Sequence, residues 1–457
     1  MFKRNIYSKL LNWKQKEKRK PLILRGARQV GKSFIMKHFA ETEFERFHYL
    51  NFESEKNLHS IFTTSLNPNK ALELYEIASG NHVDPTTDLV IFDELQACPE
   101  AITSLKYFAE QLPTSWVLAA GSLLGLELTS ASYPVGKVEL LDMFPCCFSE
   151  FLAATGEQKL IDYLSELTLN QEIPAALHDK AWQTLLNYYC TGGLPASIEA
   201  FNSESNRLNG LRASREVLDT LTHLYLGDFS KNAGKENALH IERVFTAIPE
   251  QLAQAVDENV DKFLFKDVLP KNSRFSQIAG PLSWLKKASL IIQTYIVGQG
   301  ESPLTPYREE NKFKLYLFDT GLLGALAKIK VTDILQQDYG SYKGFYAENF
   351  IAQELRCHSV SDLFSWVGRS AEVEFVVESE KGTYPIEVKA GKSKRSRSLS
   401  VFQQKYQPSC AYVFNSQPRI ISKTKESETT IREQWPLYLA FRVFNELLCV
   451  QQYIHRV

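Results

Sequence analysis

A glycine-rich segment near the start of the chain has the residue types and the spacing that bind phosphate. The sequence GARQVGKS, residues 26–33, fits the pattern Gly-x4-Gly-Lys-Ser. Its two glycines let the backbone turn tightly and point several N–H groups at phosphate oxygens. Lys32 can reach the β- and γ-phosphates and Ser33 can coordinate Mg²⁺, so the segment predicts a P-loop for ATP and Mg²⁺. The residues predicted to contact the nucleotide are Gly26, Ala27, Arg28, Gln29, Val30, Gly31, Lys32, Ser33 and Phe34.

Two adjacent carboxylates supply the second half of such a site. The segment LVIFDE, residues 89–94, places Asp93 and Glu94 after four apolar residues, at the carboxyl end of a buried strand. That end of an open α/β sheet is where ligands bind. We expect Asp93 to hold Mg²⁺ through water and Glu94 to orient or deprotonate the attacking water. Ser122, at the end of the next strand, is either a sensor of the γ-phosphate or an ordinary turn residue after Gly121.

A third group of chemically capable residues lies toward the C-terminus. Glu374, Glu387 and Lys389 are spaced E-x12-E-x-K, and Glu348 precedes them on an expected helix. In the strand IEVKA, Glu387 and Lys389 fall on one face because side chains alternate along a strand. The pattern suits either a metal site or a solvated strand surface. The basic run KSKRSR, residues 392–397, follows it and is either a contact for a phosphate backbone or a solvated loop.

The elements that must position these residues alternate between strand and helix. Short aliphatic or β-branched runs, separated by helix-length segments, predict a parallel sheet that is buried on both faces. A strand precedes the P-loop and the helical segment SFIMKHFAE follows it, which is the context that the motif requires. The five predicted strands are residues 21–26, 48–52, 89–94, 116–122 and 137–143.

The remainder of the chain predicts three further parts. After a helical stretch, the segments FSQIAGPLSWLKKASL, LIIQTYIV and FKLYLFD give the helix–strand–loop–strand order in which a winged helix ends. Arg274, Lys286 and Lys287 could contact DNA phosphates there, although winged helices also dock proteins. The predicted fold is α/β, with a P-loop ATPase domain at 1–150, a helical connector or lid at 151–262, a winged-helix module at 263–330 and a second α/β module at 339–457.

The composition restricts the partners. A chain of 457 residues with 44% apolar and 23% charged residues is typical of a soluble protein of several domains. Its net charge of -1 means that nucleic acid would have to meet a local basic patch. Seven cysteines without a CxxC pair suit a reducing compartment. We find no signal peptide and no apolar run near the roughly 18 residues of a membrane span, so we expect a cytoplasmic protein that does not engage a membrane.

The motifs GARQVGKS, LVIFDELQ, GSLLG and FSEFL resemble the bacterial and archaeal AAA-type ATPases that carry a C-terminal domain of uncharacterised function. The resemblance extends to the end of the chain. KLYLFDTGLLGAL is similar to the winged-helix portion of that family, and YAENFIAQEL, GRSAEVEFVVE and PIEVKAGKS are similar to its restriction-endonuclease-like, PD-(D/E)XK-like module.

For that module the resemblance implies that Glu348, Glu374 and Glu387 hold one or two Mg²⁺ ions, while Lys389 orients or activates the water that attacks phosphorus. The chain departs from the family at two places. Glu374 stands where relatives usually have Asp, and Gly136–Lys137 stands where relatives often have Arg before the fifth strand. The finger that relatives supply from this position could come from Lys137 or from an arginine of a neighbouring subunit, and the second would require oligomerisation.

Two functions of different classes follow. In the first, the chain is an enzyme that acts on DNA, for example double-stranded DNA. ATP turnover then controls a metal-dependent cut in that DNA. In the second, it is a nucleotide-driven switch whose C-terminal module does not cut but binds DNA or a protein partner. A purely structural protein is disfavoured, because both nucleotide-site motifs are intact.

Overall fold

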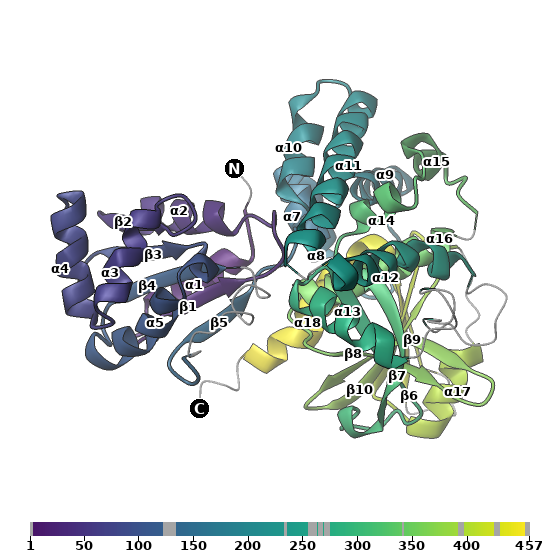
Figure 1. Ribbon diagram of the computed structural model, residues 1–457. Coiled ribbons are helices and arrows are strands. Elements are labelled where there is room, and N and C mark those ends of the chain that lie inside the picture. The colour runs from purple at the N-terminus through teal and green to yellow at the C-terminus, as the bar shows by residue number, and fades with distance from the viewer. Residues whose placement is uncertain are drawn as a thin grey trace. The chain divides into compact units, whose positions relative to one another are not determined.

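The computed structural model describes residues 3–121, 134–232, 235–254, 263, 268, 275–340, 342–391, 397–424 and 430–452. The chain divides into two compact units (Figure 1), the first made of residues 3–144 with 287–289 and the second of residues 145–286 with the chain from 290 onward. Within the described residues, no helix combines the length and the apolar character needed to cross a membrane. The cytoplasmic location stays a prediction.

A five-stranded parallel sheet forms the centre of the first unit, as predicted. Its strand order is β2-β3-β4-β1-β5, and each neighbouring pair runs parallel. Because the strands are parallel, the carboxyl ends of β1 and β3 lie at the same edge of the sheet, next to the predicted nucleotide residues. The strands are β1 Leu22–Arg25, β2 Phe47–Asn51, β3 Leu89–Asp93, β4 Trp116–Gly121 and β5 Glu139–Asp142.

Helices cover both faces of this sheet, which explains why its strands are almost continuously apolar. One face packs against α3, α4 and α5 through a core that includes Phe62, Phe92 and Leu105. The helix after the P-loop, α2, contacts β3 and β4, and it buries Ile35 and Phe39. The helices of this unit are α1 Ile6–Lys14, α2 Lys32–Glu43, η1 Lys56–Leu58, α3 His59–Thr64, α4 Pro68–Ser79, η2 Leu95–Ala97 and α5 Pro99–Gln111.

The second unit begins with a run of helices, and the role of this stretch as a connector or lid stays a prediction. The longest of them, α11, packs against α9, α10, α12 and α14. The helices up to the first strand of this unit are α7 Phe148–Ala154, α8 Gln158–Glu166, α9 Ala175–Thr191, α10 Pro195–Ser203, α11 Arg207–Asn232, α12 Lys235–Gln254 and α13 Phe275–Lys287.

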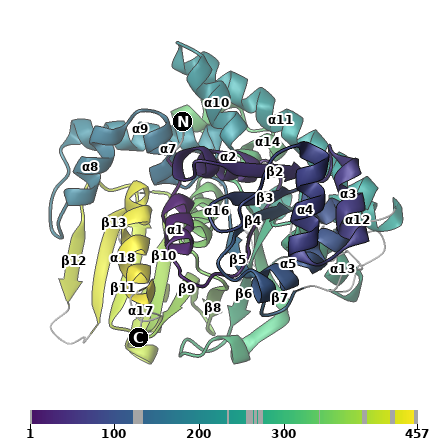
Figure 2. The same cartoon turned by 90° about the vertical axis from the view of Figure 1, so that its left-hand side faces the viewer.

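An eight-stranded mixed sheet organises the rest of the second unit (Figure 2). Its order is β12-β13-β11-β10-β9-β8-β6-β7. The strands are β6 Ile291–Val297, β7 Arg308–Leu317, β8 Leu363–Val367, β9 Glu372–Ser379, β10 Gly382–Val388, β11 Cys410–Asn415, β12 Ile421–Thr424 and β13 Ile431–Pro436. The helical segments among and after them are η5 Thr305–Tyr307, α14 Thr320–Leu326, α15 Val331–Gln336, α16 Tyr342–Cys357, α17 Arg397–Tyr406, η6 Leu437–Leu439 and α18 Ala440–Gln452.

The two strands that the sequence predicts for a winged helix are present as β6 and β7, and they pair antiparallel. However, β6 also pairs in parallel with β8, so both strands extend the C-terminal sheet. The boundary predicted between residues 263–330 and 339–457 therefore falls inside one sheet. An isolated two-stranded hairpin is only marginally stable, and joining a larger sheet lets these strands bury their apolar residues.

A buried polar network joins the start of the second unit to α16. Oε1 of Glu354 accepts a hydrogen bond from the backbone N–H of Phe148 at 2.7 Å. Its other carboxyl oxygen, Oε2, is buried and has no hydrogen-bond partner among the residues that the structure describes. Burial, reinforced by the neighbouring Glu150 and opposed by the Phe148 N–H, raises the pKa of Glu354 to about 8.

We expect a Glu354→Gln variant to lose less stability than the wild-type chain when the pH rises from about 6.5 to about 8.5. The folded chain binds the Glu354 proton more tightly than the unfolded chain does, so its contribution is complete below the ordinary pKa of 4.5 and is lost as the pH rises through about 8. Glutamine keeps an acceptor for Phe148 but has no proton to release. Asp319, whose pKa burial raises to about 6, titrates mostly below this window.

Urea unfolding at both pH values, followed by circular dichroism, measures this difference. Equal shifts of the unfolding midpoint with pH in the two proteins would contradict the role assigned to Glu354.

Candidate functional site

The P-loop closes through two glycine positions. Gly31 has a φ of 95° and forms the N-cap of α2, so the helix begins directly at Lys32. Gly26 has a φ of 155°, and a Cβ atom there would lie 2.1 Å from the backbone oxygen of Met143. The loop thus runs against the chain that follows β5, in a path that only glycine can follow at this point. Its backbone leads into a helix N-terminus, which favours a bound anion.

The side chain of Lys32 lies within the loop. Its Nζ donates hydrogen bonds to the backbone oxygens of Gly26 at 3.1 Å and Ala27 at 2.8 Å. Burial lowers the pKa of Lys32 to about 8, although the nearby carboxylates of Glu94 and Asp93 favour its charged form. The structure therefore brings together the lysine and the two carboxylates that the sequence predicts for one site.

Both oxygens of Asp93 are held by protein donors. Oδ1 accepts from the backbone N–H of Glu94 at 2.9 Å, and Oδ2 accepts from the hydroxyl of Tyr49. The residue is only 2% exposed. Glu94 itself has a φ of 51°, a strained conformation for a residue with a side chain, and its Oε2 accepts from Nε2 of Gln96. Tyr49 and Gln96 were not predicted from the sequence as members of this site.

The other residues predicted for this site lie as follows. The ring of Phe34 is 52% exposed, one residue beyond Ser33. Lys137, which stands near the family's arginine position, forms an ion pair with Glu110 at 3.0 Å. Ser122 lies outside the described residues, so its role as a phosphate sensor stays a prediction.

The C-terminal carboxylates converge on neighbouring strands. The antiparallel register of β9 and β10 pairs Phe375 with Ile386, the residues next to Glu374 and Glu387. Nζ of Lys389 lies 2.6 Å from Oε1 of Glu387 and 3.4 Å from Oε1 of Glu374. Burial, and next the charge of Glu387, raise the pKa of Glu374 well above its usual range. The two carboxylates of the E-x-K pattern are therefore largely buried, while the Lys389 side chain is 32% exposed, so the pattern does not form a solvated strand surface.

Strand β7 adds residues to this region that the sequence did not indicate. Oε2 of Glu348 accepts from the Tyr316 hydroxyl at 2.8 Å and lies 4.0 Å from Nζ of Lys314. Lys314 is only 4% exposed, and its Nζ is 2.5 Å from Oε1 of Glu372. Across the part of the chain that the structure describes, no group of three or more His, Cys, Asp or Glu residues is arranged to hold a metal ion. Lysine ammonium groups contact these carboxylates instead.

The predicted DNA contacts are only partly described. Arg274 and residues 392–396 of the basic run lie outside the described residues. Arg397 begins α17. Nζ of Lys286 donates to the Tyr295 hydroxyl at 2.8 Å, so this lysine also supports the β6 side of the sheet.

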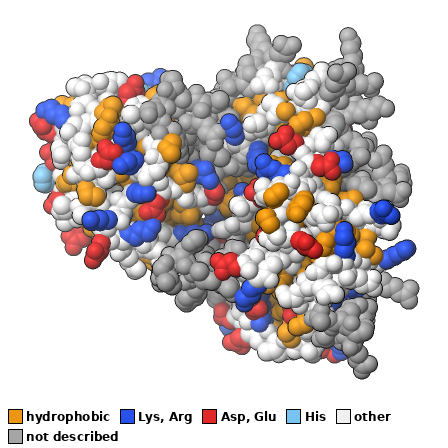
Figure 3. Space-filling view, turned by 90° about the horizontal axis from the view of Figure 1, so that it is seen from below, with side chains coloured by type: hydrophobic (Ala, Val, Ile, Leu, Met, Phe, Trp, Pro, Cys, Tyr) orange, Lys and Arg blue, Asp and Glu red, His pale blue; other side chains and the backbone are white. Residues whose placement is uncertain are grey.

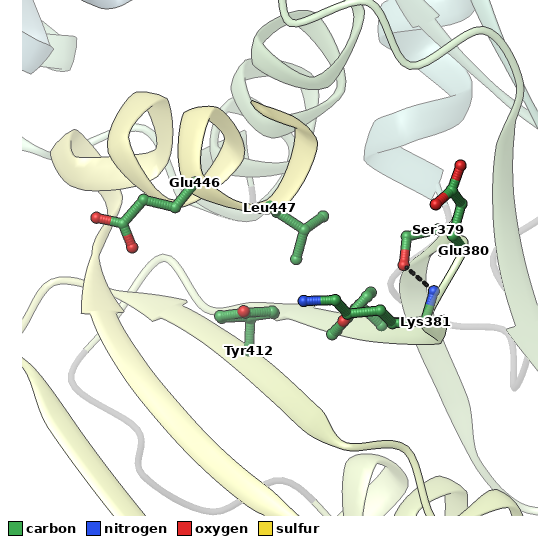
Figure 4. Close-up of a pocket in the computed structure, with 7 residues that line it drawn as sticks. Ser379, Glu380, Lys381, Tyr412, Glu446 and Leu447 are labelled. Carbon is green, nitrogen blue, oxygen red and sulfur yellow. Dashed lines mark hydrogen bonds between the residues drawn. The ribbon is translucent and has the colours of Figure 1, made fainter. Parts of the chain in front are cut away.

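A hollow lies elsewhere in the second unit, between the β9–β10 turn and α18 (Figure 4). Figure 4 shows Lys381 extending beside Tyr412 under Leu447, with Glu446 on the next part of the helix. Its lining residues belong to neither the P-loop nor the carboxylate cluster: Ser379, Glu380, Lys381, Tyr384, Tyr412, Glu446 and Leu447.

Comparison with protein families divides the chain into three parts. Residues 18–152 match an AAA domain. Residues 183–333 and 343–437 match two domains of unknown function, DUF8612 and DUF4143. No curated protein matches the chain.

The search of solved structures finds a Walker-type ATPase of Pyrococcus abyssi that is 16% identical. The match covers 71% of this chain and 96% of the Pyrococcus protein, with a TM-score of 0.43. The ORC1 protein of Aeropyrum pernix in complex with DNA is 12% identical, with 72% and 92% covered and a TM-score of 0.27.

Proposed function

We propose that this chain, which carries an AAA-type P-loop ATPase domain in residues 18–152, hydrolyses ATP and uses the cycle to switch the state of its second unit. One observation carries the proposal. The P-loop lysine Lys32 is held inside the loop by the backbone oxygens of Gly26 and Ala27, and the Asp93 carboxylate is held in one orientation next to Glu94. Burying charged groups costs free energy. A P-loop that had lost its function would therefore not need to keep three buried or half-buried charged groups together.

The residues present fit a Mg²⁺–ATP complex. The P-loop offers the N-terminus of α2, the Lys32 ammonium and the Ser33 hydroxyl, while Asp93 offers a carboxylate held in one orientation by two donors. Mg²⁺, when bound, would neutralise the charge that develops on the phosphate oxygens. Lys32 would position the β- and γ-phosphates, Ser33 and Asp93 would hold the cation, and Glu94 would orient or deprotonate the attacking water.

The chain that leaves the ATPase sheet is attached to the P-loop region. The backbone N–H of Met143 donates to the oxygen of Arg25 at 2.8 Å. The side chain of Arg4 donates to the backbone oxygen of Val30 in the P-loop at 3.1 Å and to that of Phe144 at 2.7 Å. A movement of the loop on nucleotide binding would therefore reach the last residues of the first unit.

The residues that follow Phe144 in the chain are hydrogen-bonded within the second unit. The N–H of Cys146 donates to the oxygen of Gly193 at 2.7 Å, and the N–H of Phe148 donates to Glu354 of α16 at 2.7 Å. Helix α16 also carries Glu348 of the carboxylate cluster. We propose a switch, and not an ATPase domain that acts alone, because the residues on each side of the covalent link at 144–145 are hydrogen-bonded within their own unit.

The experiment that tests the proposal is phosphate release from ATP by the purified chain, with Lys32→Ala as the blank and with or without double-stranded DNA. We expect a Mg²⁺-dependent rate that disappears in the blank. A rate that DNA raises would favour a DNA partner, whereas a rate indifferent to DNA would direct the search to a protein partner. Figure 3 shows basic and acidic side chains interspersed on the viewed face, which suits either partner. No Lys32-dependent rate at all would refute the proposal.

A second candidate function is metal-dependent cleavage of DNA by the C-terminal module. The observation that favours it is Glu387, which is 2% exposed and whose Oε2 has no hydrogen-bond partner within the described part of the chain. A buried carboxylate oxygen without a partner is costly, and a cation would satisfy it.

If the chain cuts DNA, replacing Glu387 by Gln should lower the cutting rate at least about a hundredfold, because the cluster would lose its most buried charge. The measurement is cleavage of supercoiled plasmid with Mg²⁺ or Mn²⁺. Glu380→Gln, an exposed position on the β9–β10 turn, is the matched control and should keep the wild-type rate. Cleavage that persists in Glu387→Gln would place the activity elsewhere.

A further inference from the structure

Tyr49 lies between the two halves of the nucleotide site, and neither motif includes it. It is the middle residue of β2, paired in register with Ile91 of β3, two positions before Asp93. Its ring is half-buried and its hydroxyl donates to Oδ2 of Asp93. A tyrosine in the run FHYLN resembles an ordinary apolar strand residue, but here its polar end reaches the neighbouring strand.

The bond to Tyr49 completes the fixation of the Asp93 carboxylate. The other oxygen, Oδ1, is held at 2.9 Å by the N–H of Glu94, a donor from the same chain segment. A backbone donor alone leaves the carboxylate free to rotate about its last bond. The added hydroxyl fixes the plane of the group and leaves the remaining lone pairs for a cation or its water.

Tyr49 also contacts the P-loop side of the site. The ammonium of Lys37, in the second turn of α2, lies 4.1 Å from the centre of the Tyr49 ring, within cation–π range. Burial raises the pKa of Tyr49, and the nearby side chain of Ser33 opposes this rise. The Tyr49 side chain therefore contacts both Lys37 of the P-loop helix and the predicted Mg²⁺ ligand Asp93.

We propose that Tyr49 is a positioning residue of the Mg²⁺–nucleotide site: it orients the Asp93 carboxylate toward Ser33 and thereby sets the affinity for Mg²⁺ rather than for the nucleotide itself. The inference rests on the proposed ATPase function and specifies how its cation site is built. It assigns the hydroxyl no contact with phosphate. Loss of the hydroxyl should consequently affect the cation requirement and leave the phosphate contacts of the P-loop intact.

Tyr49→Phe tests this, because phenylalanine keeps the ring, its packing and the contact with Lys37. A fluorescent ATP analogue is titrated into each protein over a series of Mg²⁺ concentrations and also in EDTA. Mg²⁺ should increase the affinity for the analogue, and we expect the Mg²⁺ concentration that gives half of this increase to rise about tenfold in the variant. This is the usual effect of removing a residue that orients a metal ligand, about tenfold or more. Affinity in EDTA should stay within about twofold of wild type. The steady-state rate should show the same shift in Mg²⁺ requirement.

Tyr75→Phe is the matched control. Tyr75 lies on α4 in the same unit, and its ring packs against His48 instead of the nucleotide residues. This variant should show wild-type Mg²⁺ dependence. An unchanged Mg²⁺ dependence in Tyr49→Phe, or an equal loss of affinity with Mg²⁺ and in EDTA, would overturn the inference. Failure of the wild-type chain to bind the analogue at all would instead refute the proposed ATPase function, so the two failures are distinguishable.

Discussion

ATP turnover should fall at least about a hundredfold when Glu94 is replaced by glutamine, while ATP binding stays within about twofold of wild type. Glutamine has nearly the same shape but cannot accept a proton, so the attacking water loses its base. The backbone N–H of residue 94 is unaffected and still holds Asp93. Phosphate release and titration of a fluorescent ATP analogue measure the two quantities separately.

Glu73→Gln is the control for this experiment, because Glu73 is exposed on α4 and pairs with Lys70 away from the site. If Glu94→Gln keeps a wild-type rate, the base is another residue. If it loses binding together with turnover, Glu94 holds the loop in place and does not act on water.

The second large effect is expected from Gly26→Ala. The new Cβ would lie 2.1 Å from the backbone oxygen of Met143, and the φ of 155° is already unfavourable for any residue with a side chain. Backbone cannot yield as the end of a flexible side chain can, so the loop must move. We expect loss of detectable ATP binding and a decrease of about 3 kcal/mol in the free energy of unfolding.

Gly80→Ala separates the effect of the unfavourable backbone φ from the effect of the steric clash. Gly80 also has a positive φ, 73°, but a Cβ there would meet no atom within 4 Å. It should lose only about 1 kcal/mol of stability, from the left-handed backbone alone, and keep ATP binding. Unchanged nucleotide affinity in Gly26→Ala would show that the approach of the P-loop to Met143 is dispensable.

The nucleotide half of the molecule was predictable because its signals are local. Each strand of the first sheet is buried on both faces, so it reads as an apolar run, and the P-loop requires glycines at fixed spacing. Asp93 and Glu94 stand out because two carboxylates end an apolar strand. All these signals lie within a few residues of the features that they predict.

The residues that sequence reasoning missed are defined by neighbours far along the chain. Tyr49 bonds to a residue 44 positions away, and Tyr316 bonds to one 32 positions away. Both tyrosines sit in strands where an aromatic side chain is also a normal core residue, so the residue type alone carries no functional signal. Lys314 is similar, since a lysine in an edge strand ordinarily points to solvent.

The extent of the second sheet could not be predicted for a related reason. A helix followed by two strands has the same local pattern whether the strands form a wing or extend a larger sheet. Only the pairing of β6 with β8 distinguishes the two, and this pairing joins residues about 70 positions apart, such as Thr294 and Leu363.

The pairing of β6 with β8 limits where the chain can be divided into separate proteins, in a truncation experiment or during evolution. The matches at 183–333 and 343–437 meet between β7 and β8, so a gene divided there would leave Lys314 on one product and Glu372 on the other. Each product would expose an open strand edge that invites aggregation. The two regions should therefore be inherited together, and recombination that shuffles one without the other should be rare among functional descendants.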